Sequence, residues 1–240
     1  MQRDTEAITS AGPGSTEKPG PLISLQSVSL GYDERPVLQR VDLNIYPAGL
    51  IGVAGPNGSG KTTLFRAILG LLPVRGGTLV RNCARSDFGY VPQSASLDPQ
   101  FPLSAAQVVE MGAYGRVSFY QLLPRKEKKR LREVLEQVGL PHLAARSFFS
   151  LSGGQKQRIL IARALMTNPK IMILDEPLSG VDEESRRSIT TLLIKLTREN
   201  GLAVVFSSHD LEMVQRVADR IVRVDKGKVW IEEKAEKVEA

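Results

Sequence analysis

Apolar residues recur in short alternations and runs that predict strands in the first hundred residues of the chain. Residues 22–30 and 37–46 alternate apolar and polar positions, as strands at a sheet edge do, with a polar turn between them. Two shorter apolar runs, 50–54 and 88–91, predict further strands. The first of these runs leads directly into a glycine-rich loop and a helix expected from about residue 61 to 69.

The pattern changes to helical spacing in the middle of the chain, from about residue 104 to 165. On one segment Leu131, Val134, Leu135 and Val138 recur every three or four positions. After this region strands alternate with helices. The expected order is strand 171–174, helix 183–198, strand 203–207, helix 211–218, and strands 221–224 and 228–231. Alternating strands and helices predict an α/β fold with a parallel sheet covered on both faces, into which the helical middle is inserted.

The same pattern divides the chain into parts. The first residues are rich in Gly, Pro, Ser, Thr and charge and have no periodicity, so they are expected to be disordered. The predicted parts are a lead-in over 1–21, one domain over 22–235 (core at about 22–93 and 166–235, helical insertion at about 94–165) and a tail over 236–240.

Composition and charge narrow the class of protein without identifying it. The chain has 240 residues, 42% of them hydrophobic and 24% charged, with a formal net charge of +6, which is ordinary globular usage. No apolar run approaches the roughly 18 residues of a membrane span, and the first 21 residues lack the apolar stretch of a secretory signal. The lone Cys83 excludes an internal disulfide. We therefore expect a soluble, cytoplasmic protein.

The glycine-rich loop carries a strong chemical signal. Residues 55–62 read GPNGSGKT, which fits the phosphate-binding pattern G-x-x-x-x-G-K-[ST] between a strand and a helix. Its glycines let successive backbone N–H groups face phosphate oxygens, and the helix N-terminus adds positive potential. Lys61 can reach the β- and γ-phosphates, and the Thr62 hydroxyl can ligate Mg²⁺. The expected ATP-binding residues here are Gly55, Pro56, Asn57, Gly58, Ser59, Gly60, Lys61, Thr62 and Thr63.

Two adjacent carboxylates follow the apolar run at 171–174. This run predicts a central strand, and Asp175 and Glu176 would stand at its carboxyl end, where ligands bind in parallel sheets. Asp175 is the natural direct or water-mediated partner of Mg²⁺. Glu176 is placed to orient and deprotonate the water that attacks the γ-phosphate. Beside a phosphate-binding loop, this pair predicts nucleotide hydrolysis.

A second glycine motif, LSGGQ, occupies residues 151–155 ahead of a helix expected at 156–165. Ser152, Gly153 and Gly154 again present N–H groups at a helix N-terminus. About ten residues of helix span roughly 15 Å and separate this motif from the strand that carries Asp175. One chain is therefore not expected to aim both glycine motifs at one phosphate. Two chains arranged head to tail could.

Together, LSGGQ, GPNGSGKT and ILDEP resemble the ATPase subunit of ATP-binding-cassette (ABC) transporters, and the resemblance covers about residues 22–235. It implies a P-loop NTPase (RecA-like) sheet core with an antiparallel β edge and a helical insertion subdomain. It also implies that ATP and Mg²⁺ are the cofactors and that an ATP-dependent homodimer forms. The insertion would dock on integral membrane permease subunits, with a location at the cytoplasmic face of the membrane.

The resemblance assigns roles to further residues. Tyr32 matches the aromatic residue that stacks on adenine, and Gln93 matches the glutamine that touches Mg²⁺ and the attacking water. His209 matches the histidine that contacts the γ-phosphate, and Asp182 ends a loop, SGVD, that crosses the dimer interface. The implied catalytic residues are Glu176, His209, Gln93 and Lys61, the implied metal ligands are Thr62, Gln93 and Asp175, and the motif residues at the partner's nucleotide are Ser152, Gly153, Gly154 and Gln155.

Other functions compete with transport. A soluble ABC-type ATPase of translation or DNA repair would act on nucleic acid, but such chains usually carry two cassettes or a long coiled-coil insertion. This chain has one set of motifs and an insertion without heptads. The basic run at 125–130 is interpreted as a solvated helix start, and no nucleic-acid partner is expected. A regulatory module without turnover is disfavoured because Glu176 and His209 are both present.

The cargo is inferred from resemblance alone. Residues 88–116, which include YVPQ and the pairs Val108-Val109 and Met111-Gly112, resemble the subfamily that imports manganese, zinc or related metals. Iron chelates and cobalamin are the alternative cargo classes. Two histidines and one cysteine are too few for a selective transition-metal site in this chain. Selectivity would therefore lie in the permease or in an extracytoplasmic substrate-binding protein.

Overall fold

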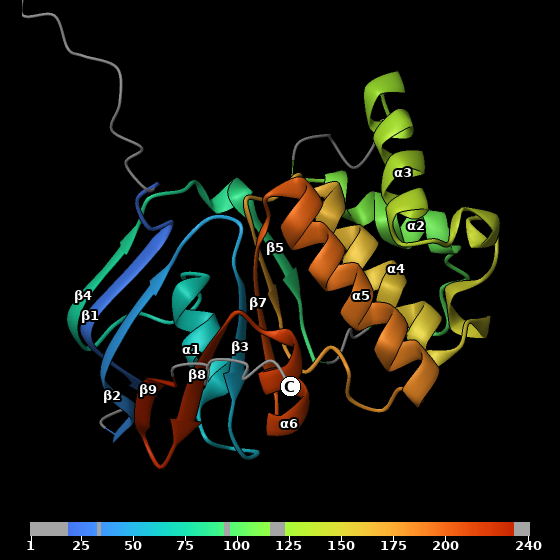
Figure 1. The fold of residues 1–240 in the computed structure, drawn as a ribbon. Coiled ribbons are helices and arrows are strands. Elements are labelled where there is room, and N and C mark those ends of the chain that lie inside the picture. The colour runs from blue at the N-terminus through green and yellow to red at the C-terminus, as the bar shows by residue number, and fades with distance from the viewer. Residues whose placement is uncertain (1–18, 33–34, 94–96, 116–122, 233–240) are drawn as a thin grey trace, which may run out of the picture.

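The computed structural model describes residues 19–32, 35–93, 97–115 and 123–232, which form two sheets and flanking helices (Figure 1). The strands are β1 (Ile23–Tyr32), β2 (Arg35–Ile45), β3 (Leu50–Ala54), β4 (Gly76–Arg81), β5 (Phe88–Val91), β6 (Ile171–Leu174), β7 (Ala203–Ser208), β8 (Arg220–Asp225) and β9 (Lys228–Glu232). The helices are α1 (Lys61–Ile68), α2 (Ala105–Glu110), α3 (Arg125–Gln137), α4 (Gly153–Met166), α5 (Glu183–Asn200) and α6 (Leu211–Val217). The predicted tail and most of the predicted lead-in lie outside the described residues.

The larger sheet has six strands in the order β5-β6-β7-β3-β8-β9. The neighbours from β5 to β8 are parallel, and β9 returns antiparallel to β8. All residues of β3, β6 and β7 are buried, which explains why these strands are short apolar runs in the sequence. Because the parallel strands end at one edge, this edge collects the loops that follow β3, β5, β6 and β7.

Helices cover both faces of this sheet, as the alternation predicts. Within β7, Ala203 and Val205 pack in the apolar cluster that includes α1. Val204 and Phe206 point to the opposite cluster, which includes residues of α4, α5 and α6. The resulting α/β core is the predicted fold, and it fixes the direction in which each strand delivers its following loop.

The second sheet has three antiparallel strands in the order β2-β1-β4. Helix α1 lies between the two sheets (Figure 1) and fills the space with fully buried Leu64, Phe65 and Ile68. The pattern predicted β1 and β2 but missed β4. Five of the six residues of β4 are exposed, so it lacks the alternation that marks a half-buried strand.

The segment between β5 and β6 is helical in its described residues. Val134, Leu135 and Val138 are buried, as their spacing predicts, and Val108 and Val109 of α2 are fully buried. Helix α4 begins three residues earlier than expected because Ser152 caps it: the Ser152 hydroxyl accepts from the Gln155 N–H, and the Gln155 side chain accepts from the Ser152 N–H.

Candidate active site

A cavity of about 500 Å³ lies at the carboxyl edge of the six-stranded sheet. The loop from β3 to α1 forms one side of it, and the carboxylates after β6 form another. Gly58 and Gly60 have positive φ values of 77° and 110°, a left-handed conformation that favours glycine. The cavity is lined by Val37, Asn57, Gly58, Gly60, Lys61, Thr62, Thr63, Gln93, Asp175 and Glu176. Gln93 after β5 therefore shares this cavity with the phosphate-binding loop.

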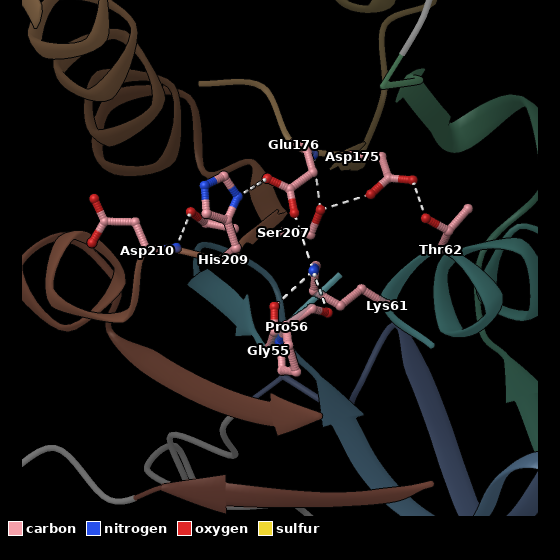
Figure 2. A network of polar contacts seen from close by, with 10 residues as sticks. Gly55, Pro56, Lys61, Thr62, Asp175, Glu176, Ser207, His209 and Asp210 are labelled. Atoms are coloured by element: carbon pink, nitrogen blue, oxygen red, sulfur yellow. Dashed lines mark hydrogen bonds and ion pairs between the residues drawn. The ribbon is translucent and has the colours of Figure 1, made fainter. Parts of the chain in front are cut away.

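Lys61 is folded back onto its own loop. Its ammonium group donates to the carbonyl of Gly55 at 2.8 Å and to that of Pro56 at 3.1 Å. It also forms an ion pair with Glu176, with 3.1 Å between Nζ and Oε1, and both side chains are only 6% exposed. Figure 2 shows the ammonium group between the loop and the carboxylate. The charge of Lys61 is thus compensated within the cavity.

Thr62 and Asp175 are joined across the cavity. The Thr62 hydroxyl donates to Asp175 Oδ2 at 2.7 Å (Figure 2). Together with Gln93, which lines the same cavity, these side chains offer hydroxyl, carboxylate and amide oxygens. Such a small set of oxygen donors fits Mg²⁺, which proteins usually hold through one or two carboxylates and the phosphates of a substrate. Among the described residues, no group of three or more His, Cys, Asp or Glu side chains could hold a metal ion. A metal ion at this site would need the phosphates of a substrate as further ligands.

Glu176 stands in a strained backbone conformation next to His209. Its φ of 50° lies in the left-handed region, which is uncommon for a non-glycine residue. Glu176 Oε2 lies 3.0 Å from Nδ1 of His209, while Oε1 faces Lys61. Glu176 is buried, whereas the His209 side chain is 56% exposed. The carboxylate therefore lies between the buried lysine and a largely exposed histidine.

Tyr32 is not among the described residues that line the cavity. It ends β1, is 43% exposed, and its hydroxyl accepts a hydrogen bond of 2.9 Å from Nη1 of Arg66 on α1. This hydrogen bond raises the pKa of Arg66. The sequence did not point to Arg66, because a basic residue inside an amphipathic helix carries no motif.

The LSGGQ motif belongs to a second cluster. Its residues are absent from the described lining of the cavity, and they start α4 beside the start of α5. A Cβ added to Gly154 would lie 2.1 Å from the Ser185 hydroxyl oxygen, and one added to Gly153 would lie 3.7 Å from the Gly180 carbonyl. The two helix starts are therefore packed so closely that only glycine fits at position 154.

Asp182 caps α5 in this second cluster. The Ser185 N–H donates to Oδ1 at 2.8 Å and the Ser185 hydroxyl donates to Oδ2 at 2.9 Å. The hydrogen bond from the Ser185 N–H, followed by that from its hydroxyl, lowers the pKa of the Asp182 carboxyl. The structure thus brings LSGGQ and Asp182 together, but places them in a different cluster from the phosphate-binding loop.

Residues 38–179, more than half of the chain, match the family model described as "ABC transporter". This chain belongs to the ABC transporter family. The predicted resemblance is confirmed, and the fold is that of an ABC-type ATPase.

Among the relatives of this ABC ATPase are two ATP-binding proteins of metal transport systems. The chain is 40% identical to the manganese transport system ATP-binding protein MntB of Bacillus subtilis (strain 168), covering 83% of this chain and 82% of the relative. It is 39% identical to the zinc transport system ATP-binding protein TroB of Treponema pallidum (strain Nichols), covering 83% and 77%. Both matches extend over most of each chain.

A solved cassette shows the same fold with nucleotide products bound. The dimeric post-hydrolysis structure of the ATP-binding cassette MJ0796, bound to ADP and phosphate, is 30% identical to this ABC ATPase. It superposes with a TM-score of 0.74 over 89% of this chain and 99% of that chain. ABC cassettes therefore bind nucleotide and assemble as dimers. Over the described residues, every helix of the present chain is too short or too polar to cross a bilayer.

One residue at the site of this ABC ATPase was missed in the sequence. Ser207 lies in the SSHD segment, in which the motif indicates only His209. Its hydroxyl contacts both residues of the Asp175-Glu176 pair. The available signal was a hydroxyl residue at the end of an otherwise apolar central strand, directly before the carboxyl edge where the carboxylates were expected.

Proposed function

We propose that this chain hydrolyses ATP with Mg²⁺ to power a transporter that imports a transition metal such as manganese or zinc. The observation that carries the ATPase part is the single cavity shared by Lys61, Thr62, Gln93, Asp175 and Glu176. These residues come from three separate loops at one sheet edge, and each supplies a group that phosphoryl transfer to water requires.

Nucleotide binding is assigned to the phosphate-binding loop. Its backbone N–H groups and the start of α1 would surround the phosphates, and Lys61 would exchange its present carbonyl partners for phosphate oxygens. Thr62, Asp175 and Gln93 would hold Mg²⁺, and the ion would offset the negative charge of the phosphates. Tyr32, at the end of β1, would stack on adenine and is held at its hydroxyl by Arg66.

Water activation is assigned to Glu176. Its Oε2 lies 3.0 Å from Nδ1 of the largely exposed His209, whereas Oε1 remains against Lys61. A water beside this carboxylate would give up its proton to Glu176 as it attacks the γ-phosphorus. His209 would orient the carboxylate and contact the γ-phosphate. Gln93 would hold the same water from the β5 side.

The second glycine cluster supports a head-to-tail homodimer. Ser152, Gly153, Gly154, Gln155 and Asp182 lie outside the described cavity lining, so they are assigned to the nucleotide of the other chain. Each composite site would then contain the phosphate-binding loop of one chain and the LSGGQ motif of its neighbour. ATP would hold the two chains together until it is hydrolysed.

Lys61→Ala is expected to weaken ATP·Mg²⁺ binding by roughly 10- to 100-fold. Hydrogen bonds to charged groups contribute about 1.5–3 kcal/mol, and each 1.4 kcal/mol is about tenfold in affinity. The measurement is a binding titration with ATP·Mg²⁺ on the purified chain. Lys195→Ala is the matched control, because this α5 lysine is 55% exposed and pairs with Glu199 at 3.8 Å. An unchanged affinity in Lys61→Ala would remove Lys61 from the binding site.

The partners follow from the family. The helical segment between β5 and β6 would dock on permease subunits in the membrane and transmit to them the conformational change that ATP binding causes. This docking would place the chain at the cytoplasmic face of the membrane. A substrate-binding protein outside the cell would select the cargo. Co-purification with membrane proteins tests this against the soluble alternative: recovery of the chain without any membrane protein would favour the soluble class.

Deleting the gene is expected to lower cell-associated manganese or zinc and to slow growth under chelation. The metal assignment is supported by the manganese and zinc transport relatives. The wild-type gene should restore the metal, whereas a gene encoding Glu176→Gln should not, because it cannot turn over ATP. Measuring several metals in the same cells distinguishes the cargo. Normal manganese and zinc with impaired uptake of an iron chelate or cobalamin would replace the metal assignment and leave the ATPase mechanism intact.

A further inference from the structure

Ser207 lies at the centre of the carboxyl edge of the six-stranded sheet. It is 1% exposed and belongs to β7, whose neighbours are β6 on one side and β3 on the other. β6 leads into the carboxylate pair and β3 leads into the phosphate-binding loop. The end of β7 therefore lies between the two halves of the active site.

The Ser207 hydroxyl makes two short hydrogen bonds to consecutive residues. It accepts the backbone N–H of Glu176 at 2.8 Å and donates to Asp175 Oδ1 at 2.7 Å. Figure 2 shows it between Asp175 and Glu176. On the β3 side, the next residue of β7 accepts from the phosphate-binding loop, since the Ser208 carbonyl lies 3.3 Å from the Gly55 nitrogen.

These bonds fix two carboxylates that point in different directions. Asp175 is held at both oxygens, Oδ1 by Ser207 and Oδ2 by Thr62, so its plane is set relative to the cavity. Glu176 departs from the strand with a φ of 50°, and its N–H is anchored by the same hydroxyl. The strained turn at Glu176 aims its carboxylate at Lys61 and His209.

We propose that Ser207 is a positioning residue for ATP hydrolysis: its hydroxyl orients Asp175 toward the metal side of the cavity and holds the turn that directs Glu176 to the attacking water. The proposal rests on the proposed ATPase function. Outer partners of metal ligands and of catalytic carboxylates set their orientation, and their loss typically lowers metal affinity or activity by about 10- to 100-fold. Ser207 is such an outer partner for both Asp175 and Glu176.

Removing the Ser207 hydroxyl affects both of its hydrogen-bond partners. Ser207→Ala would free Asp175 Oδ1 and leave the buried Glu176 N–H without its acceptor. We expect kcat for ATP to fall about 10- to 100-fold, with little change in KM at saturating Mg²⁺. The Mg²⁺ concentration for half-maximal activity should rise, because Asp175 is no longer held in place.

A binding measurement separates positioning from general damage. A fluorescent, non-hydrolysable ATP analogue is titrated into each full-length variant, once with Mg²⁺ and once with EDTA. In EDTA, Ser207→Ala should bind the analogue as tightly as wild type does. It should lose most of the increase in affinity that Mg²⁺ gives to wild type, which we call the Mg²⁺ gain. A variant with lower stability but an unchanged Mg²⁺ gain and an unchanged kcat would overturn the proposal.

A pair of variants of equal shape isolates the hydroxyl. Ser207→Thr and Ser207→Val add nearly the same volume to the buried site, and only threonine keeps the hydroxyl. Threonine should retain the Mg²⁺ gain and more of the activity than valine; equal loss in both would overturn the proposal. The control is Thr197→Val in α5, which removes another buried hydroxyl, one that donates to the Leu193 carbonyl at 3.0 Å. It should leave kcat and the Mg²⁺ gain unchanged.

Failure of the proposed function would look different. If wild type binds the analogue with a Mg²⁺ gain but hydrolyses no ATP, the ATPase proposal fails. The Mg²⁺ gain of the Ser207 variants then still decides whether Ser207 positions Asp175. If wild type hydrolyses ATP and Ser207→Ala matches it in kcat and in Mg²⁺ dependence, only the positioning proposal fails.

Discussion

Replacing Glu176 by glutamine is expected to lower ATP hydrolysis by on the order of 10² or more, in keeping with the loss of a general base. Glutamine keeps the shape of the side chain and leaves Thr62 and Asp175 in place, so Mg²⁺ and ATP should still bind. It removes the carboxylate that would take the proton of the attacking water. The measurement is the steady-state release of phosphate by the purified chain.

The same variant should not bind ATP more weakly. In wild type the ammonium group of Lys61 is paired with Glu176 at 3.1 Å, and this pair has to loosen when the phosphates arrive. Glutamine cannot form the ion pair, so Lys61 is freer to meet the phosphates. Because bound ATP would hold two chains together without being consumed, the variant should elute as a dimer in ATP·Mg²⁺ during size-exclusion chromatography.

A surface variant controls for the loss of one acidic charge. Glu199→Gln alters a glutamate at the end of α5 that is 64% exposed and pairs with Lys195 at 3.8 Å. It should hydrolyse ATP at the wild-type rate and remain in the wild-type oligomeric state. A Glu176→Gln chain with normal turnover would remove Glu176 from the mechanism, whatever its oligomeric state.

The sequence predicted most of the core because its signals are local. β3, β6 and β7 are buried on both faces and are therefore apolar runs, and the phosphate-binding loop is specified by eight consecutive residues. β4 was not predicted, because pairing with β1 alone makes it a strand while most of its side chains stay exposed. An exposed edge strand has no pattern of burial to detect.

Contacts between distant segments could not be predicted in the same way. Ser207 meets the carboxylate pair only because β7 is parallel to β6 in a register that pairs Leu174 with Phe206. Likewise, the close packing of Gly154 on Ser185 depends on how α4 and α5 lie together. The sequence contains each participant, but the register and the helix packing that join them arise from the whole core.

Ser152→Arg is expected to lower hydrolysis by on the order of 10², an effect comparable to misplacing a positioning group, while each chain alone still binds ATP. Ser152 lies in the cluster with Asp182, outside the described lining of the cavity, so an arginine there leaves the chain's own phosphate-binding loop intact. The bulky cation would instead stand where the neighbour's nucleotide has to fit. ATP turnover and ATP affinity are measured on the same preparation.

Ser104→Arg is the matched control for the lost helix cap. Ser104 caps α2 as Ser152 caps α4: its hydroxyl accepts from the Gln107 N–H, and the Gln107 side chain accepts from the Ser104 N–H. Both substitutions remove a serine cap, which costs about 0.5–2 kcal/mol, and both introduce an arginine. Only Ser152→Arg should lower turnover to this extent. If both variants lost turnover equally, the effect would come from the loss of helix stability and not from the neighbour's nucleotide site.

Mixing the two impaired variants Ser152→Arg and Lys61→Ala then tests the head-to-tail arrangement. A dimer of one Ser152→Arg chain and one Lys61→Ala chain has one composite site with an intact phosphate-binding loop and an intact LSGGQ motif. Its other site carries both substitutions. Random pairing of equal amounts makes half of the dimers mixed, so independent sites would restore about a quarter of the wild-type rate. If each chain worked alone, both variants would lack a required group and mixing would restore nothing. Recovery of turnover on mixing therefore requires that each chain lends its LSGGQ motif to the nucleotide of the other.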